Sequence, residues 1–368
     1  MEHKKLGDIA TYINGYAFKP QDRGEKGLPI IRIQDLTGNA YDVGFYDGDY
    51  PERIEINDGD ILISWSASLG VYIWDKGKAL LNQHIFKVVF DKIKVDKRYF
   101  VFAVQYKLKE MELKTHGATM KHIVKKDFDN TLIPFPSIKD QIEIANIISK
   151  ASEIISLRQE QLEKLEELIR ARFVEMFGDE NNSKNWNVVN VEDVADVQVG
   201  VVIKPSQYYT DESEGVRAFR SLNIGAGFIK DIDWVYFTKE GHLKNSKSIL
   251  KENDLLIVRS GAPGTACVVT EEYAGCNAVD IIIAHPDCEK VNPYYLCTFT
   301  NMPHGKKQID EGIGGAAQQH FNVGKYNKLQ LMLPPKTLQD EFGDFINQVD
   351  KSKLQYYPHT HACQPNTS

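Results

Sequence analysis

Leu6-Gly7-Asp8-Ile9-Ala10 and Val191-Glu192-Asp193-Val194-Ala195 are two versions of one stretch, and together they decide the fold. The offset between them is 185 residues, and the glycine and the Lys-Pro pair that follow each stretch keep it. Further matches continue to the end of each half, at offsets that grow to 188, 194 and 198 residues. Such steps are expected when loops differ in length while secondary-structure elements are kept. The chain is therefore a tandem duplication.

Each copy contains short apolar alternations bounded by Gly, Asp, Asn and Pro, which predict β-strands. Ile85-Phe86-Lys87-Val88-Val89-Phe90 is one example. Apolar residues at helical spacing predict a short helix over 97–112 in the first copy and over 293–303 in the second. Each copy then reaches a proline-marked strand, at 132–136 and at 331–335.

The period of the sequence changes after each proline-marked strand. From Lys139 to about Phe177, apolar residues recur by fours and threes, which is a heptad seam. Gly178 lies where a helix stop is expected. The second copy begins the same helix, but its pattern fades by Leu354, and prolines in the tail cannot continue it. The seam residues are Ile144, Ile148, Ile155, Leu162, Leu165, Ile169 and Met176 in the first helix, and Phe342, Ile346 and Val349 in the second.

These elements predict an α+β fold, in which a β-rich domain followed by a long helix is present twice. We expect the two helices to pack as an antiparallel coiled coil, which would make the molecule pseudo-twofold. The predicted segments are a first domain at 1–137, a long spacer helix at 138–178, a second domain at 179–335, a short distal helix at 336–355 and an unstructured tail at 356–368.

The composition is that of a globular protein. The chain has 368 residues, of which 42% are hydrophobic and 26% are charged. No stretch approaches the roughly 18 apolar residues of a membrane span, and no apolar run follows the first basic residues, so we expect neither a membrane segment nor a signal peptide. The five cysteines form no C-x-x-C pair. A reduced, cytoplasmic protein is therefore expected.

Charge is unevenly distributed along the chain. The net charge is −7, which argues against nucleic acid only as an average. Residues 42–60 carry seven acidic residues and one arginine, whereas residues 87–126 carry eleven Lys and Arg against four Asp and Glu. This segregation permits a positive surface suited to phosphates. A lysine-rich solvated surface is the alternative.

Signs of catalysis are weak. Gly312-Ile313-Gly314-Gly315 lacks the Lys-Ser/Thr of a phosphate loop. Asn292-Pro293-Tyr294-Tyr295 resembles a methyltransferase signature, but its counterpart in the first copy is Asp96-Lys97-Arg98-Tyr99. His359-x-His361-x-Cys363 could bind a metal only from the tail. We therefore predict no catalytic residue and no metal ligand.

Polar residues recur at matching places in the two copies, in loops beside the predicted strands. Lysines and backbone N–H groups bind phosphates, whereas Gln, Asn and Arg side chains can bond to base edges. Ordinary turn chemistry is the alternative for each loop. The candidate DNA-binding residues are Lys19, Arg32, Gln34, Ser64, Trp65, Ser66, Ser68, Thr119, Lys121, His122, Lys125 and Lys126 in the first copy, and Lys204, Arg220, Asn223, Arg259, Ser260, Gln318, Gln319, His320 and Lys325 in the second.

The order of these blocks, twice in one chain, resembles the specificity subunit of type I restriction-modification systems over about 1–355. The blocks that carry the resemblance are Lys5-Leu6-Gly7-Asp8-Ile9-Ala10, Gly59-Asp60-Ile61-Leu62-Ile63-Ser64, Leu81-Asn82-Gln83-His84-Ile85, Gly117-Ala118-Thr119-Met120-Lys121-His122-Ile123, and Ile133-Pro134-Phe135-Pro136 followed by Gln141.

The resemblance implies a DNA-sequence-recognition subunit that is not itself an enzyme. Its two target-recognition domains would each read one half of an asymmetric, bipartite site in double-stranded DNA. It would dock methyltransferase and restriction subunits, and S-adenosylmethionine, ATP and Mg would be needed only in those partners. The short second helix departs from the family, so a truncated or stand-alone DNA-binding relic with impaired assembly is the alternative. A tandem β-scaffold protein that does not bind DNA is the other.

Overall fold

The computed structural model describes residues 2–39, 42–114, 123–312 and 321–354. The chain divides into two compact units, residues 1–157 and 158–368. The boundary lies inside the long helix, which spans Ile138–Phe177 where the spacer helix was predicted at 138–178. Each half of the helix belongs to the unit of one β-rich domain. The predicted tail, 356–368, lies outside the described residues.

The described residues of the first domain form two four-stranded sheets and a two-stranded ribbon. One sheet is antiparallel, in the order β2 (Thr11–Asn14), β9 (Ile85–Val89), β6 (Ile61–Ser64) and β7 (Gly70–Ile73). The other has the order β4 (Phe45–Tyr46), β3 (Leu28–Ile31), β8 (Ala79–Leu81) and β5 (Glu55–Ile56), with β3 and β8 parallel. The ribbon pairs β1 (His3–Lys5) with β10 (Leu132–Pro134).

The second domain repeats this plan. Its antiparallel sheet has the order β12 (Ala195–Val199), β19 (Ile281–Pro286), β16 (Leu255–Val258) and β17 (Ala266–Val268). Its mixed sheet has the order β13 (Tyr209–Thr210), β15 (Val235–Phe237), β14 (Val216–Phe219) and β18 (Asn277–Ala278), with β14 and β18 parallel. The ribbon pairs β11 (Asn187–Asn190) with β20 (Gln330–Leu333). The tandem α+β duplication predicted from the sequence is therefore confirmed.

The central strands β6 and β16 explain why each domain needs a continuous apolar run. Successive side chains of a strand point to opposite faces of the sheet. Ile61 and Ile63 belong to one hydrophobic core, and Leu62 belongs to another. In β16, Leu255 and Ile257 likewise pack in one core while Leu256 and Val258 pack in another. Both faces are thus buried, because each sheet lies between two layers.

Two matching helices, α3 (Lys97–Lys114) and α7 (Pro293–Asn301), lie where the short helices were predicted. A buried glutamine ties the start of each to the helix that follows the domain. The Gln141 Oε1 atom accepts from the Asp96 backbone N–H at 3.0 Å, and the Gln339 Oε1 atom accepts from the Asn292 backbone N–H at 2.9 Å. Both glutamines are 0% exposed. The other short helices are α1 (Leu6–Ile9), α2 (Ile33–Thr37), α4 (Lys125–Asp129), α6 (Lys239–Lys244), α8 (Pro303–Gly312) and α9 (Val323–Asn327).

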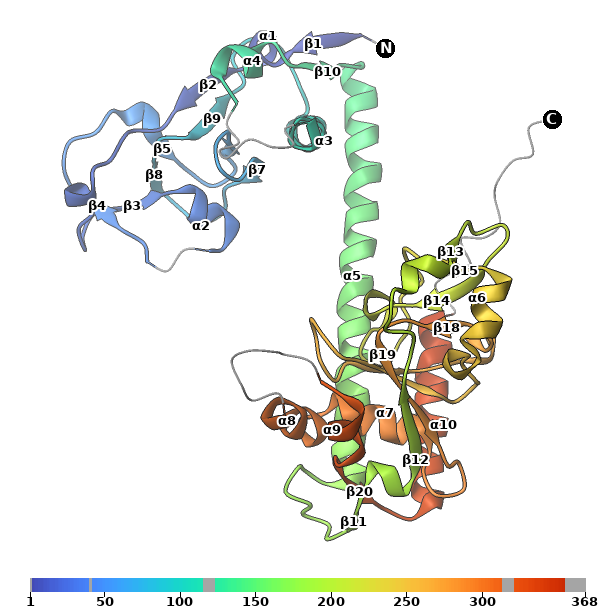
Figure 1. Ribbon diagram of the computed structural model, residues 1–368. Coiled ribbons are helices and arrows are strands. Elements are labelled where there is room, and N and C mark those ends of the chain that lie inside the picture. The colour runs from blue at the N-terminus through green and yellow to red at the C-terminus, as the bar shows by residue number, and fades with distance from the viewer. Residues whose placement is uncertain (1, 40–41, 115–122, 313–320, 355–368) are drawn as a thin grey trace. The chain divides into compact units, whose positions relative to one another are not determined.

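The long helix, α5 (Ile138–Phe177), has 40 residues and stops at Gly178, whose φ of +88° suits glycine. Its C-terminal half lies beside α10 (Lys336–Leu354) in Figure 1. An Arg172 Nη atom lies 3.2 Å from a Glu341 Oε atom, and Arg158 donates to the Lys353 carbonyl at 3.0 Å. Contacts that run in opposite sequence directions establish an antiparallel helix pair.

The predicted seam residues of this pair are buried or half-buried, whereas one seam position outside the pair is exposed. Met176, Phe342, Ile346 and Val349 are buried, and Leu162, Leu165 and Ile169 are half-buried. In the N-terminal half of α5, Ile144 and Ile148 are half-buried as well. Ile155 is 65% exposed and precedes Arg158, whose side chain bonds to the last described turn of α10.

Candidate nucleic-acid interface

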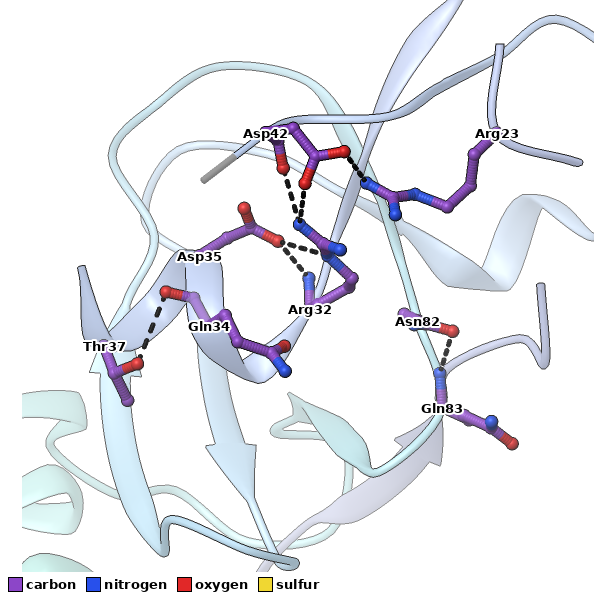
Figure 2. Close-up of polar contacts among 8 residues, drawn as sticks. All are labelled: Arg23, Arg32, Gln34, Asp35, Thr37, Asp42, Asn82 and Gln83. Carbon is purple, nitrogen blue, oxygen red and sulfur yellow. Dashed lines mark hydrogen bonds and ion pairs between the residues drawn. The ribbon is translucent and has the colours of Figure 1, made fainter. Parts of the chain in front are cut away.

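Arg32, a predicted base reader, follows β3 and has its guanidinium held by two carboxylates (Figure 2). The Nε atom lies 3.3 Å from the Asp35 Oδ2 atom. The Nη2 atom donates to the Asp42 carbonyl at 2.5 Å and lies 3.4 Å from the Asp42 Oδ1 atom. The other Asp42 carboxylate oxygen pairs with Arg23 at 3.0 Å. Arg32 therefore closes the loop between β3 and β4.

Arg220 does the same in the second domain, where it precedes the short 3-10 helix Ser221–Asn223. Its Nη2 atom donates to the Asp233 carbonyl and lies 3.2 Å from the Asp233 Oδ2 atom. The Arg220 backbone N–H donates to the Asn223 Oδ1 atom at 2.9 Å, as that of Arg32 does to Asp35 at 2.8 Å. Equivalent bonds in both copies indicate a structural role for the two arginines.

Two other predicted DNA contacts are corrected, because their side chains are buried with their polar atoms already bonded. Ser64 is 0% exposed and donates to the Ser68 carbonyl at 2.5 Å. Asn223 is 0% exposed and donates to the Ile232 carbonyl at 2.6 Å. Polar residues in turns commonly satisfy backbone groups in this way. Neither residue presents a polar side-chain atom at the surface.

Gln34 and Gln83 are different, because both are exposed. Figure 2 shows their side-chain amides without a bond to the other residues drawn. Gln34 is a predicted candidate, whereas Gln83 was not chosen from the sequence, although it lies in one of the family-like blocks. A glutamine amide can bond bidentately to adenine. These two amides are available for such contacts.

The turns after β6 and β16 carry the candidates Trp65 and Arg259. The Trp65 ring lies 4.9 Å from the His84 ring, centre to centre, and its Nε1 atom donates to the Asn14 Oδ1 atom at 3.3 Å. In the second domain, Arg259 forms an ion pair with Asp280. His84 and Asp280 were not predicted from the sequence. Both have a positive φ, +73° and +50°, just before β9 and β19.

A lysine side chain forms a hydrogen bond to the turn that follows β16. Lys306, on α8, donates to the Pro263 carbonyl at 2.7 Å. Burial lowers the pKa of the Lys306 ammonium group. The turn that carries Arg259 is thus fixed at its far end.

The remaining described candidates lie on the surface or at its edge. Lys125 is bound to Asp129 at 2.8 Å and lies 5.6 Å from the Phe86 ring centre, so its ammonium is partly occupied. The exposed lysines suited to phosphate contacts are Lys19, Lys126, Lys204 and Lys325. Ser68 is exposed, and Ser66 and Ser260 are half-buried.

Six candidates fall outside the described residues, so the structure does not place them. They are Thr119, Lys121, His122, Gln318, Gln319 and His320. Among the residues that are described, there is no group of three or more His, Cys, Asp and Glu side chains arranged to hold a metal ion. In the same part of the chain, no helix has the length and apolar character needed to cross a membrane.

A family model, the type I restriction modification DNA specificity domain, matches residues 1–167 and again residues 183–356. The chain belongs to this family. One match covers each copy of the repeat, in agreement with the resemblance seen in the sequence.

Individual relatives agree with this assignment. The EcoBI specificity subunit of Escherichia coli is 22% identical, with 94% of this chain and 78% of that protein covered. The MjaVIII specificity subunit of Methanocaldococcus jannaschii is 27% identical, with 94% and 85% covered. A crystal structure of the type I S subunit from M. genitalium has a TM-score of 0.58 at 16% identity, covering 96% of this chain and 90% of that one. That likeness concerns the fold.

Specificity subunits of this family are non-catalytic, and the catalytic activities belong to partner subunits. The match of both halves of the chain to a DNA specificity domain agrees with the lack of a convincing catalytic motif in the sequence. The candidate side chains described above are therefore considered for binding and not for catalysis.

Proposed function

We propose that this specificity subunit selects the DNA sequence for a type I restriction-modification enzyme, with each domain reading one half of an asymmetric bipartite site. The observation that carries the proposal is the family match to both halves of the chain. The loops at equivalent strand ends support it, because they carry different side chains in the two domains. Two readers that differ would recognise two different half-sites.

We propose that the length of α5 sets the gap between the half-sites. Its 40 residues correspond to roughly 60 Å at about 1.5 Å per residue. A spacer of fixed length would set the half-site separation, as dimer geometry does for palindromic operators.

We further propose that the exposed apolar side chains of α5 dock methyltransferase subunits. Ile147 is 61% exposed, Ile154 is 66% exposed and Leu157 is 58% exposed. Ile155, from the predicted seam, is exposed beside them. Exposed apolar side chains that cluster on one stretch of helix commonly mark protein-binding surfaces. Restriction subunits would join the same complex in the cytoplasm, and S-adenosylmethionine, ATP and Mg would be bound by the partners alone.

Co-expression with the cognate methyltransferase subunit tests the proposal, with single-molecule sequencing used to map methylated adenines. We expect a new methylated motif that is split and asymmetric. The same methyltransferase paired with an intact specificity subunit is the control.

If that control methylates DNA while this folded chain directs no methylation, the proposal fails. Binding of the isolated chain to duplex DNA then separates the two alternatives. Retained binding would indicate a relic that has lost assembly, and absent binding would indicate a β-scaffold protein.

A further inference from the structure

The guanidinium of Arg259 is fixed by contacts from two directions. It pairs with the Asp280 carboxylate, and its Nε atom donates to the Phe321 carbonyl at 3.3 Å. The Arg259 carbonyl in turn accepts from the Phe321 backbone N–H at 3.0 Å. The Arg259 side chain remains 18% exposed, and that of Asp280 remains 47% exposed. The ion pair therefore lies at the surface with its geometry already set.

The pair lies at the end of two adjacent strands, which is a suitable position for side chains that recognise a base. Arg259 follows the last residue of β16, and Asp280 precedes the first residue of β19. Val258 and Ile281 are register partners in the sheet, so the two side chains start from adjacent strand ends. Rigid strands place a recognition side chain more accurately than a long loop does.

The chemistry of the pair favours guanine. An arginine fork bonds bidentately to the O6 and N7 acceptors of guanine, which is the commonest specific base contact. Asp280 limits the rotation of the Arg259 side chain before DNA arrives, so less conformational freedom is lost on binding. It also offsets the arginine charge, which reduces attraction to phosphates of any sequence.

The first domain carries a different pair at the same place. Ser64 and Ile85 are the register partners there, and Trp65 and His84 follow and precede them. The Trp65 carbonyl accepts from the Ile123 backbone N–H at 2.9 Å, matching the bond between Arg259 and Phe321. The Trp65 ring also stacks on Phe86 with 5.6 Å between ring centres. An indole cannot make the bidentate guanine contact, because two acceptors need two donors and an indole has a single N–H.

We propose that Arg259 is a specificity-determining residue that reads a guanine in the half-site of the second domain, and that Asp280 is its positioning residue. This inference rests on the proposed function. It distinguishes Arg259 from Arg32 and Arg220, whose guanidinium groups make the same loop-closing bonds in both copies.

The test uses the complex with the methyltransferase and compares methylated motifs of the wild type, Arg259→Lys and Asp280→Asn. For Arg259→Lys, we expect discrimination for guanine to fall about 10- to 100-fold at one position of one half-site, because a bidentate contact is lost. The other half-site should be unchanged. Asp280→Asn should weaken the same preference while the melting temperature stays close to that of the wild type.

Arg217→Lys is the matched control, because Arg217 belongs to the same domain and lies 5.6 Å from the Trp234 ring centre. It should leave the motif unchanged. If Arg259→Lys keeps every base preference of the wild-type complex, the inference is overturned while the proposed function stands. If Asp280→Asn keeps the guanine preference, the positioning role is overturned. If the wild type directs no methylation under the control conditions above, the proposed function fails and this inference fails with it.

Discussion

The two specificity domains share the contacts of their interiors but carry different side chains at the ends of their central strands, β6 and β16. Gln141 and Gln339 make the same buried bonds, and β6 and β16 divide their side chains between two cores in the same way. At the ends of these strands, however, an aromatic pair in the first domain replaces an ion pair in the second. The duplication has therefore kept the contacts that fold each domain and changed the side chains at the surface ends of its central strand.

The largest effect should come from a glycine that both domains share. A Cβ atom on Gly15 would lie 2.0 Å from the Asn82 carbonyl oxygen, and one on Gly200 would lie 2.3 Å from the Ala278 carbonyl oxygen. Gly15→Ala and Gly200→Ala should each destabilise their own domain by about 3 kcal/mol, because neighbouring backbone must move apart. Urea unfolding followed by limited proteolysis would measure the loss and locate it.

Gly24→Ala is the control for this comparison, since its nearest neighbour, the Phe45 carbonyl oxygen, lies 3.7 Å from the added atom. It should cost far less than the other two. Wild-type stability in both Gly15→Ala and Gly200→Ala would show that the shared interior is not what holds the domains together.

A smaller effect is expected from the arginines that the two domains share. Arg32→Gln and Arg220→Gln should lower the stability of their domains by about 1 kcal/mol each, because hydrogen bonds to backbone carbonyls are lost at a partly exposed site. Base preferences in the methylated motif should not change. A changed preference at one base would make that arginine a reader, and the comparison with Arg259 would no longer hold.

The smallest effect is expected in the reactivity of the cysteine thiols. Only the second half of the chain contains cysteines. Cys267, Cys276 and Cys297 are buried, and burial raises the pKa of the Cys276 thiol to about 11 and that of Cys297 to about 12. Because the thiolate is the reactive form, these thiols should resist iodoacetamide at pH 8. Exposed Cys288 should be labelled, in a Cys363→Ser background that removes the cysteine of the tail.

Labelling read by mass spectrometry then reports on the second domain alone. Gly200→Ala should expose the buried thiols at lower urea concentration, whereas Gly15→Ala should not. Rapid modification of Cys267 in the folded wild type would contradict the packing described here.

Much of the fold followed from the sequence, because the signals are local or repeated. The heptad spacing and Gly178 predicted α5 to within one residue at its C-terminal end, and the proline-marked strands lie at β10 and β20. The exposure of Ile155 did not follow from this pattern. A heptad pattern reports the face of a helix and not what covers it.

The site was less accessible to sequence reasoning. Ser64 and Asn223 have side chains that can bond to DNA, but both are buried and donate to backbone carbonyls within turns. Asp42, Asp233 and Asp280 were missed as arginine partners, since they lie 10, 13 and 21 residues further along the chain than the arginines they hold. The duplication offered one signal that could have found Asp280: it occupies the position of His84, beside the exchanged pair Trp65 and Arg259.

The most direct test of the central claim is to replace the second domain, residues 179–335, with a copy of the first, residues 1–137, and to map the methylated motif of the assembled complex. If each domain reads its own half-site, the second half of the motif should become a copy of the first and the first half should be unchanged. A motif that stays asymmetric, or a first half that changes as well, would contradict the account of two independent readers.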